Sequence, residues 1–189
     1  MNEADVLRRM TGALEQAGIS FMLVGSFAAT FYSEPRATQD IDIVIAAAPS
    51  QLKTLISLLP AEEYYSDLDA AIEANKRQSM FNVIDSASGW KIDFIICKSR
   101  AFDVGAFRRR VPVQFEGISL FIASVEDTIL SKLEWAKLAG SARQIEHVAS
   151  ILRVRSDSLD RAYLDQWIRE LEVTKEWEDA GSAAGIADL

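Results

Sequence analysis

The sequence has little cysteine, histidine or proline: one Cys, one His and four Pro among 189 residues. Cys97 has no second cysteine to pair with, which excludes an internal disulfide and favours a reducing compartment, the cytoplasm. One His and one Cys are too few for the ligand sets that zinc uses. No apolar stretch approaches the ~20 residues that span a bilayer, and the N-terminal segment lacks the apolar core of a signal peptide. Membrane insertion and secretion are therefore not expected.

The composition is 49% hydrophobic and 25% charged, which is typical of a globular protein. The net charge of -8 argues against broad, non-specific binding to nucleic acid, because Lys and Arg supply most of that affinity. One basic run, Arg108 to Arg110, leaves two interpretations open. It could receive acceptor phosphates, or it could cap the strand that follows.

Apolar periodicity predicts an α/β chain in which a short mixed sheet packs on helices. Helices are predicted over 3–17, 27–32, 49–59 and 68–76, and strands over 21–24, 41–45, 80–84, 91–96, 111–115 and 118–122. The last four strands are predicted to form two hairpins, because turn residues separate each pair. From Ser124 onward the pattern is helical, over 142–152 and 159–171 as well, and residues 182–185 suggest a loosely held tail. The predicted organisation is a core over 1–123 and a helical region over 124–189 that completes a cleft.

Two carboxylates stand out on the strand that begins near residue 40. Asp40 and Asp42 are separated by one apolar residue, so they project from the same face of the strand. Two carboxylates side by side on an otherwise apolar strand are costly unless a cation compensates them. Asp93 adds a third acid on a strand predicted to be a neighbour, and an oxygen cluster of this kind suits Mg²⁺ or Mn²⁺.

A Gly25-Ser26 turn precedes this strand at the start of a predicted helix. Gly25 allows the backbone to approach an anion closely, and Ser26 offers a hydroxyl and N–H groups to a phosphate. A metal-bound nucleoside triphosphate is the ligand that these features together indicate.

The ordered set of Gly-Ser, Asp-x-Asp and Asp93 resembles the signature of the polymerase-β-like nucleotidyltransferase superfamily. The amino-acid sequence around residues 36–42, 81–84 and 126–133 is similar to that of the AbiEii/MenT-like group. This resemblance covers roughly residues 5 to 170. The resemblance implies the nucleotidyltransferase fold, with Asp40, Asp42 and Asp93 as metal ligands and catalytic residues. It further implies that Lys132 contacts the triphosphate and acts in catalysis, that Gly25 and Ser26 form the phosphate turn, and that Arg36 is a nucleotide contact.

The same resemblance implies transfer of a nucleoside monophosphate, from ATP or another triphosphate, to the hydroxyl of a tRNA end or a protein. It also implies a toxin-antitoxin or phage-defence setting with a cognate toxin or antitoxin partner. One departure concerns His147, which stands where related sequences carry an aspartate. Glu146 could replace that acid only imperfectly, because adjacent helical residues point about 100° apart.

Two other functions stay open at this point. The protein could be a nucleotide-binding or partner-binding protein that kept the metal site and lost transfer activity with the distal aspartate. It could also be a small-molecule modifier similar to the aminoglycoside nucleotidyltransferases, which share the Gly-Ser and Asp-x-Asp turn. Trp135, Trp167 and Trp177 are interpreted as packing residues without chemistry.

Overall fold

The computed structural model describes residues 3–33 and 40–186 and divides the chain into two compact units. The first unit comprises Met1–Phe27 and Ala37–Ala123, and the second comprises Ala28–Arg36 and Ser124–Leu189. In the part of the chain that the structure describes, no helix combines the length and the apolar character needed to cross a bilayer.

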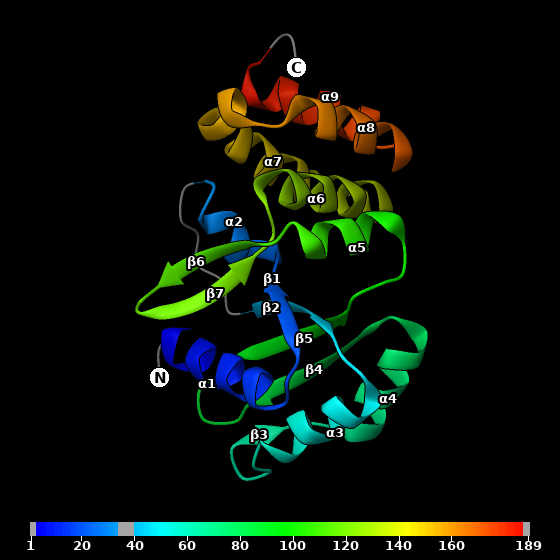
Figure 1. Cartoon of the computed structure of the whole chain (residues 1–189). Helices are drawn as coiled ribbons and strands as arrows, with labels where there is room; N and C mark the ends of the chain where they lie inside the picture. Colours follow the sequence, from blue (N-terminus) through cyan, green and yellow to red (C-terminus); the bar gives the residue numbers. More distant parts are fainter. Residues whose placement is uncertain (1–2, 34–39, 187–189) are drawn as a thin grey trace. The chain divides into compact units, whose positions relative to one another are not determined.

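The first unit is built on a mixed seven-stranded sheet in the order β3-β4-β5-β2-β1-β7-β6 (Figure 1). β2 runs parallel to β5 and β1 runs parallel to β7, and the remaining neighbours are antiparallel. Both predicted hairpins, β4-β5 and β6-β7, are confirmed by antiparallel pairing. The strands are β1 Ser20–Leu23, β2 Asp40–Ala46, β3 Tyr64–Tyr65, β4 Met80–Asp85, β5 Lys91–Ile96, β6 Val111–Phe115 and β7 Ile118–Ile122.

The two faces of the central strands differ in polarity. Residues of β2 and β5 alternate along each strand, so one face carries a fully buried apolar layer while the other carries the acids. The layer extends to β4 through Phe81, whose ring stacks on Phe94 with centroids 5.2 Å apart. The members of the layer on β2 and β5 are Ile41, Ile43, Ile45, Ile92, Phe94 and Ile96. Burial of this layer fixes the register, because a slip of one residue would turn the side chains of this layer to the polar face.

Among the described residues of the first unit, helices begin at five places: α1 Glu3–Gln16, α2 Gly25–Thr30, α3 Pro49–Ser57, α4 Leu68–Arg77 and α5 Ala101–Arg108. α1 buries Leu7, Met10 and Leu14, which follow the helical spacing seen in the sequence. α1 packs on α3 and α3 on α4, while α1 contacts β1 and α4 contacts β4. α5 is a helix that the periodicity did not predict, and its Phe107 packs with Met22 in a small apolar cluster.

The second unit is helical, as predicted, with α6 Val125–Ala139, α7 Ala142–Arg155, η1 Ser156–Ser158, α8 Arg161–Glu170 and α9 Thr174–Ala184. Ser124 caps α6 by accepting a hydrogen bond from the backbone N–H of Asp127 at 3.1 Å, which confirms the predicted capping start. α7 packs against both α6 and α9. The apolar core of the second unit includes Leu133, Val148, Ile151, Leu152, Leu164 and Trp177.

Two predictions about this helical part were wrong. The segment expected to be a loose tail, 182–185, instead forms the end of α9 and its glycine cap, Gly185. Trp135, expected to pack, is 61% exposed, whereas Trp177 is 7% exposed. α9 is held by a short apolar stripe that contains Trp177 and Ala180, and its remaining side chains are largely polar.

Candidate active site

Strand register brings the three predicted acids to one face of the sheet. Asp40 and Asp42 lie two residues apart on β2, and Asp93 is the register partner of Asp42 on the adjacent parallel strand β5. Register partners on neighbouring strands point to the same face, and the strands lie about 4.8 Å apart. The predicted neighbour relationship of the two strands is therefore confirmed. Asp40 is exposed, Asp42 is half-buried and Asp93 is only 6% exposed.

The two oxygens of the Asp93 carboxylate have different surroundings. Its Oδ2 accepts a hydrogen bond and ion pair from Lys91 Nζ at 2.7 Å. Its Oδ1 is buried and finds no hydrogen-bond partner among the described residues. A buried acceptor of this kind is costly to leave unsatisfied, and the cost is larger for a charged group. Asp93 Oδ1 therefore has the properties of an oxygen ligand for a cation.

Gly25 lies directly against the side chain of Asp42. Gly25 adopts φ +66°, and a Cβ at this position would overlap Asp42 Oδ2 and lie 2.8 Å from Asp42 Cγ. The backbone N–H of Val24 donates to the Asp42 carbonyl oxygen at 2.9 Å, which holds the two segments together. Glycine is thus required twice, for its conformation and for the space it leaves to the carboxylate.

The rest of the predicted phosphate turn is only partly described. Ser26 follows Gly25 at the start of α2, a helix of six residues. Arg36 lies outside the described residues. The roles of Gly25, Ser26 and Arg36 in nucleotide binding stay predictions.

The acids fit a divalent cation by their chemistry. Among residues 3–33 and 40–186, no group of three or more His, Cys, Asp or Glu side chains is arranged so that it could hold a metal ion. Mg²⁺ does not need such a cage, because it is usually bound through one or two carboxylates together with substrate phosphates and water. Asp42 and Asp93, in register on one face, supply two carboxylates. The unsatisfied Asp93 Oδ1 is the observation that favours a cation here.

Lys132, predicted to contact the triphosphate, lies in α6 of the second unit and is 5% exposed. Its Nζ lies 3.4 Å from His147 Nδ1 and 3.5 Å from Gln144 Oε1. His147 is therefore a buried neighbour of this lysine, at the position where the resemblance predicts an aspartate. The Glu146 carboxylate is engaged in a different contact: its Oε1 accepts a hydrogen bond from Arg153 Nη1 at 2.9 Å in an exposed ion pair. The part played by Lys132 in catalysis and nucleotide binding stays a prediction.

A second network of the second unit surrounds the start of α6. Asp127 is 1% exposed, and its Oδ1 accepts from the Tyr163 hydroxyl while its Oδ2 accepts from the Ser124 hydroxyl, both at 2.7 Å. Glu126, 7% exposed, accepts from the backbone N–H of Asp160 at 3.1 Å. Burial and the charges of Glu126 and Asp127 raise the pKa of Tyr32 to about 12, against the opposing charge of Arg155. These contacts hold the helical unit together.

The basic run has mainly structural surroundings. Arg108 is the last residue of α5. The Arg110 guanidinium lies 4.6 Å from the ring centroid of Phe107 and 4.9 Å from that of Phe121, and its Nη1 donates to the Phe107 carbonyl oxygen at 2.7 Å. Arg110 therefore ties α5 to the β6-β7 hairpin, which favours the structural interpretation for this residue.

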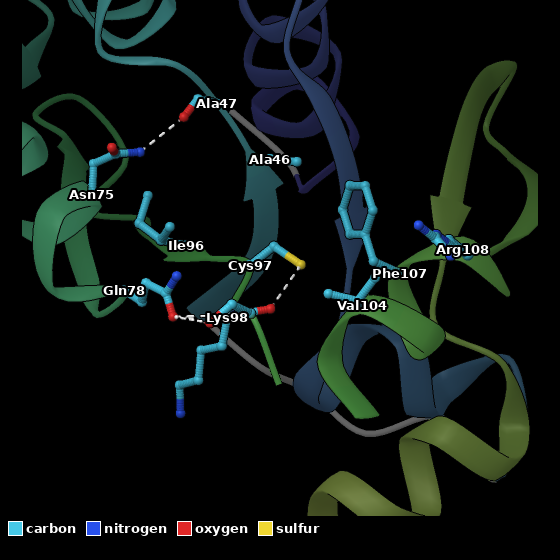
Figure 2. Close-up of a pocket in the computed structure, with 11 residues that line it drawn as sticks. Ala46, Ala47, Asn75, Gln78, Ile96, Cys97, Lys98, Val104, Phe107 and Arg108 are labelled. Carbon is cyan, nitrogen blue, oxygen red and sulfur yellow. Dashed lines mark hydrogen bonds between the residues drawn. The ribbon is translucent and has the colours of Figure 1, made fainter. Parts of the chain in front are cut away.

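A hollow of about 410 Å³ opens at the carboxyl ends of β2 and β5, the ends that lie away from the acids (Figure 2). Ala46 and Ile96 form part of its wall, with Cys97, Lys98 and Arg108 around them. Asp42 and Ala46 are four residues apart on β2, about 13 Å along the strand, so the acids do not line this hollow. Burial, and then the charge of Asp103, raise the pKa of the Cys97 thiol. A protonated thiol is a poor nucleophile, so the hollow does not offer a reactive cysteine at neutral pH.

Comparison with known proteins identifies the fold. The chain matches no family model and no curated protein sequence. Among solved structures it is similar to ANT(2'')-Ia in complex with adenylyl-2''-tobramycin, with 12% identity, 91% of this chain and 98% of that chain covered, and a TM-score of 0.61. A solution structure of the same resistance factor gives 12% identity, 96% coverage of both chains and a TM-score of 0.56. An antigenic nucleotidyltransferase-like protein from Paracoccidioides brasiliensis gives 14% identity, coverage of 93% and 89%, and a TM-score of 0.54.

The chain therefore has the nucleotidyltransferase fold, as predicted from the Gly-Ser and Asp-x-Asp signature. The narrower resemblance to the AbiEii/MenT-like group stays a prediction, as does the division into a core over 1–123 and a cleft-completing region over 124–189.

Sequence reasoning missed two polar neighbours of Asp93. Lys91 is the register partner of Asp40, and Asn82 of β4 is the register partner of Asp93 on its other side. Asp42, Asp93 and Asn82 thus form a polar row across three strands. The signal was available for Lys91, because a residue two positions before Asp93 on a strand shares its face. Asn82 could be placed only once the hairpin register was known.

Proposed function

We propose that the protein is a metal-dependent nucleotidyltransferase that moves a nucleoside monophosphate from a nucleoside triphosphate to an acceptor hydroxyl. The proposal is carried by the in-register placement of Asp42 and Asp93 beside Asp40, on one face of a sheet with the nucleotidyltransferase fold. Asp40, Asp42 and Asp93 would hold Mg²⁺ or Mn²⁺. A divalent ion at these carboxylates would neutralise charge on the triphosphate during transfer.

Residues of this chain would also bind the triphosphate and accept a proton. Gly25 and Ser26 would bind the triphosphate, and Asp93 would accept the proton of the acceptor hydroxyl. The acceptor oxygen then attacks the α-phosphorus, the bond from that phosphorus to the bridging oxygen breaks, and pyrophosphate leaves. Since Asp93 Oδ2 is held by Lys91, the buried Oδ1 is the oxygen that would contact the cation.

The acceptor that we propose is the hydroxyl of a tRNA end or of a protein side chain, in a toxin-antitoxin or phage-defence setting. This proposal rests on the sequence resemblance around residues 36–42, 81–84 and 126–133. A small cationic drug is a second acceptor, favoured by the similarity of the fold to ANT(2'')-Ia, whose structure holds adenylyl-2''-tobramycin.

A nucleotide-binding or partner-binding protein without transfer activity is the alternative function. It is favoured by His147, which lies beside the buried Lys132 in place of an aspartate. In that case the protein would bind nucleoside triphosphate in the presence of Mn²⁺ without release of pyrophosphate.

The test is transfer of label from each α-³²P nucleoside triphosphate, with Mg²⁺ or Mn²⁺, to tRNA, to lysate protein and to tobramycin. Wild type is compared with Asp42→Asn and with Asp69→Asn, which removes an exposed acid of α4. We expect label in one acceptor class with wild type and Asp69→Asn, and none with Asp42→Asn. Equal labelling by Asp42→Asn would reject the transferase, and binding without labelling by wild type would favour the alternative.

A further inference from the structure

Lys91 is in direct contact with Asp93, one of the three acids of the candidate site. It precedes Asp93 by two residues on β5 and is the register partner of Asp40, so it lies on the acid-bearing face. Its Nζ lies 2.7 Å from Asp93 Oδ2. Its side chain is 39% exposed, whereas that of Asp93 is 9% exposed, so the ammonium group is held at the solvent side of the carboxylate.

All three acids act on this ammonium group. Asp93 contacts it directly, Asp40 is the register partner of Lys91 on β2, and Asp42 lies two residues further along the same strand. Lys91 thus places a positive charge beside three neighbouring carboxylates. A divalent cation bound to the same carboxylates would meet this positive charge at short range.

We propose that Lys91 is the internal counter-ion of the acid group, and that a divalent cation competes with its ammonium group for the Asp93 carboxylate. This inference rests on the proposed function, because it takes Asp40, Asp42 and Asp93 as the metal ligands. Lys91 then sets the metal concentration at which the site fills.

The competition gives Lys91 a different role from the acids. Loss of an acid removes a ligand and weakens cation binding. Loss of the Lys91 charge removes a repulsion and strengthens cation binding, because like charges a few ångströms apart repel strongly even when partly screened. The two kinds of variant therefore shift metal affinity in opposite directions, which a purely structural role for Lys91 would not produce.

The first measurement is Mn²⁺ binding, followed by the electron paramagnetic resonance signal of free Mn²⁺, without nucleotide and at constant pH. We expect Lys91→Gln to bind Mn²⁺ about tenfold more tightly than wild type, and Lys91→Arg to remain nearer wild type because it keeps the charge. Lys98→Gln, just beyond the carboxyl end of β5, is the matched control and should bind as wild type does. Equal or weaker binding by Lys91→Gln would overturn the inference.

The second measurement is thermal unfolding of the same variants with and without Mn²⁺. Without metal, Lys91→Gln should unfold at a lower temperature than wild type, because its carboxylates repel one another. Mn²⁺ should then raise its Tm by more than it raises that of wild type, since tighter binding to the folded state gives a larger stabilisation. A smaller rise in Lys91→Gln than in wild type would contradict the inference.

Asp42→Asn separates this inference from the proposed function. If Asp42→Asn loses Mn²⁺ binding while Lys91→Gln binds as wild type does, the proposed metal site stands and the role of Lys91 is rejected. If Asp42→Asn binds Mn²⁺ as tightly as wild type does, the metal site itself is rejected, and the inference is rejected with it.

Discussion

Gly25 leaves the space that the Asp42 carboxylate occupies, since any Cβ on Gly25 would overlap Asp42 Oδ2. The predicted phosphate turn and the strand that carries the proposed metal ligands are therefore coupled through a single missing methyl group. A substitution of Gly25 would therefore act directly on the position of the Asp42 carboxylate.

Gly25→Ala should displace Asp42 and abolish both Mn²⁺ binding and nucleotidyl transfer. The variant also bears the cost of a left-handed backbone with a side chain, about 1–2 kcal/mol. Gly89→Ala is the matched control, because Gly89 has φ +74° with no atom within 4 Å of its would-be Cβ. Thermal unfolding should show a similar backbone cost in both variants, and Mn²⁺ titration should separate them. Normal Mn²⁺ affinity in Gly25→Ala would contradict the coupling.

Asp85→Asn should lower the free energy of unfolding by about 2 kcal/mol at pH 7, because Asp85 is 1% exposed and accepts charge-assisted hydrogen bonds. Its Oδ1 accepts from the backbone N–H groups of Ala87 and Ser88, and its Oδ2 accepts from Arg9 Nη2 at 2.7 Å. Urea unfolding measures the loss. Glu63→Gln, which removes only the 3.5 Å contact of the same arginine, should cost much less.

The stabilisation that Asp85 gives to the folded state should also depend on pH. Burial by itself would raise the pKa of Asp85, but hydrogen bonds from Ser88, the Arg9 charge and the Ala87 N–H together lower it below 3.8. As pH falls, the unfolded chain therefore takes up the proton first. The stabilisation is fully present above the usual carboxyl pKa and is lost as pH falls through the lower folded value. A wild-type advantage over Asp85→Asn that stays constant down to pH 2 would contradict this assignment.

Tyr163→Phe should destabilise the helical unit by about 2 kcal/mol, because it removes a hydrogen bond to the buried carboxylate of Asp127. Tyr65→Phe is the control, since Tyr65 is 65% exposed. Chemical unfolding of both variants gives the comparison. An equal, small change in both would contradict a stabilising role for the Tyr163 hydroxyl.

Cys97 should react slowly with iodoacetamide at pH 8, because burial and the charge of Asp103 raise its pKa and leave little thiolate. Asp103→Asn should speed the reaction about twofold by removing the second of these influences. Asp69→Asn, far along the chain on α4, should leave the rate unchanged. Reaction of the wild-type thiol at the rate of a free cysteine would contradict the assigned pKa direction.

Local patterns in the sequence predicted most elements of the first unit. The helical spacing of Leu7, Met10 and Leu14 and the alternation along β2 are short-range signals that need no knowledge of the fold. α5 was missed because it is short and carries Gly105 in its interior, where glycine is a poor helix former. α9 was missed because few of its residues are apolar, so the tertiary contacts of Trp177 decide its structure.

The candidate site was predictable as a set of residues and much less as a geometry. The two-residue spacing of Asp40 and Asp42 is enough to place them on one face. The pairing of Asp42 with Asp93 depends on a register between strands far apart in the chain, which only packing of the isoleucine layer determines. The contact between Lys91 and Asp93 likewise follows from strand conformation and not from the acid signature.

The register that joins β2 to β5 has a consequence for recognising distant relatives of this protein. α3, β3, α4 and β4 all lie between these two strands in the chain, whereas Asp42 and Asp93 are aligned by the direct pairing of β2 with β5. Insertions and deletions in those elements would change the separation of the acids in the sequence and leave them adjacent in space. Genome searches that require a fixed interval between the acids would pass over such proteins, whereas searches that compare sheet topology would retrieve them.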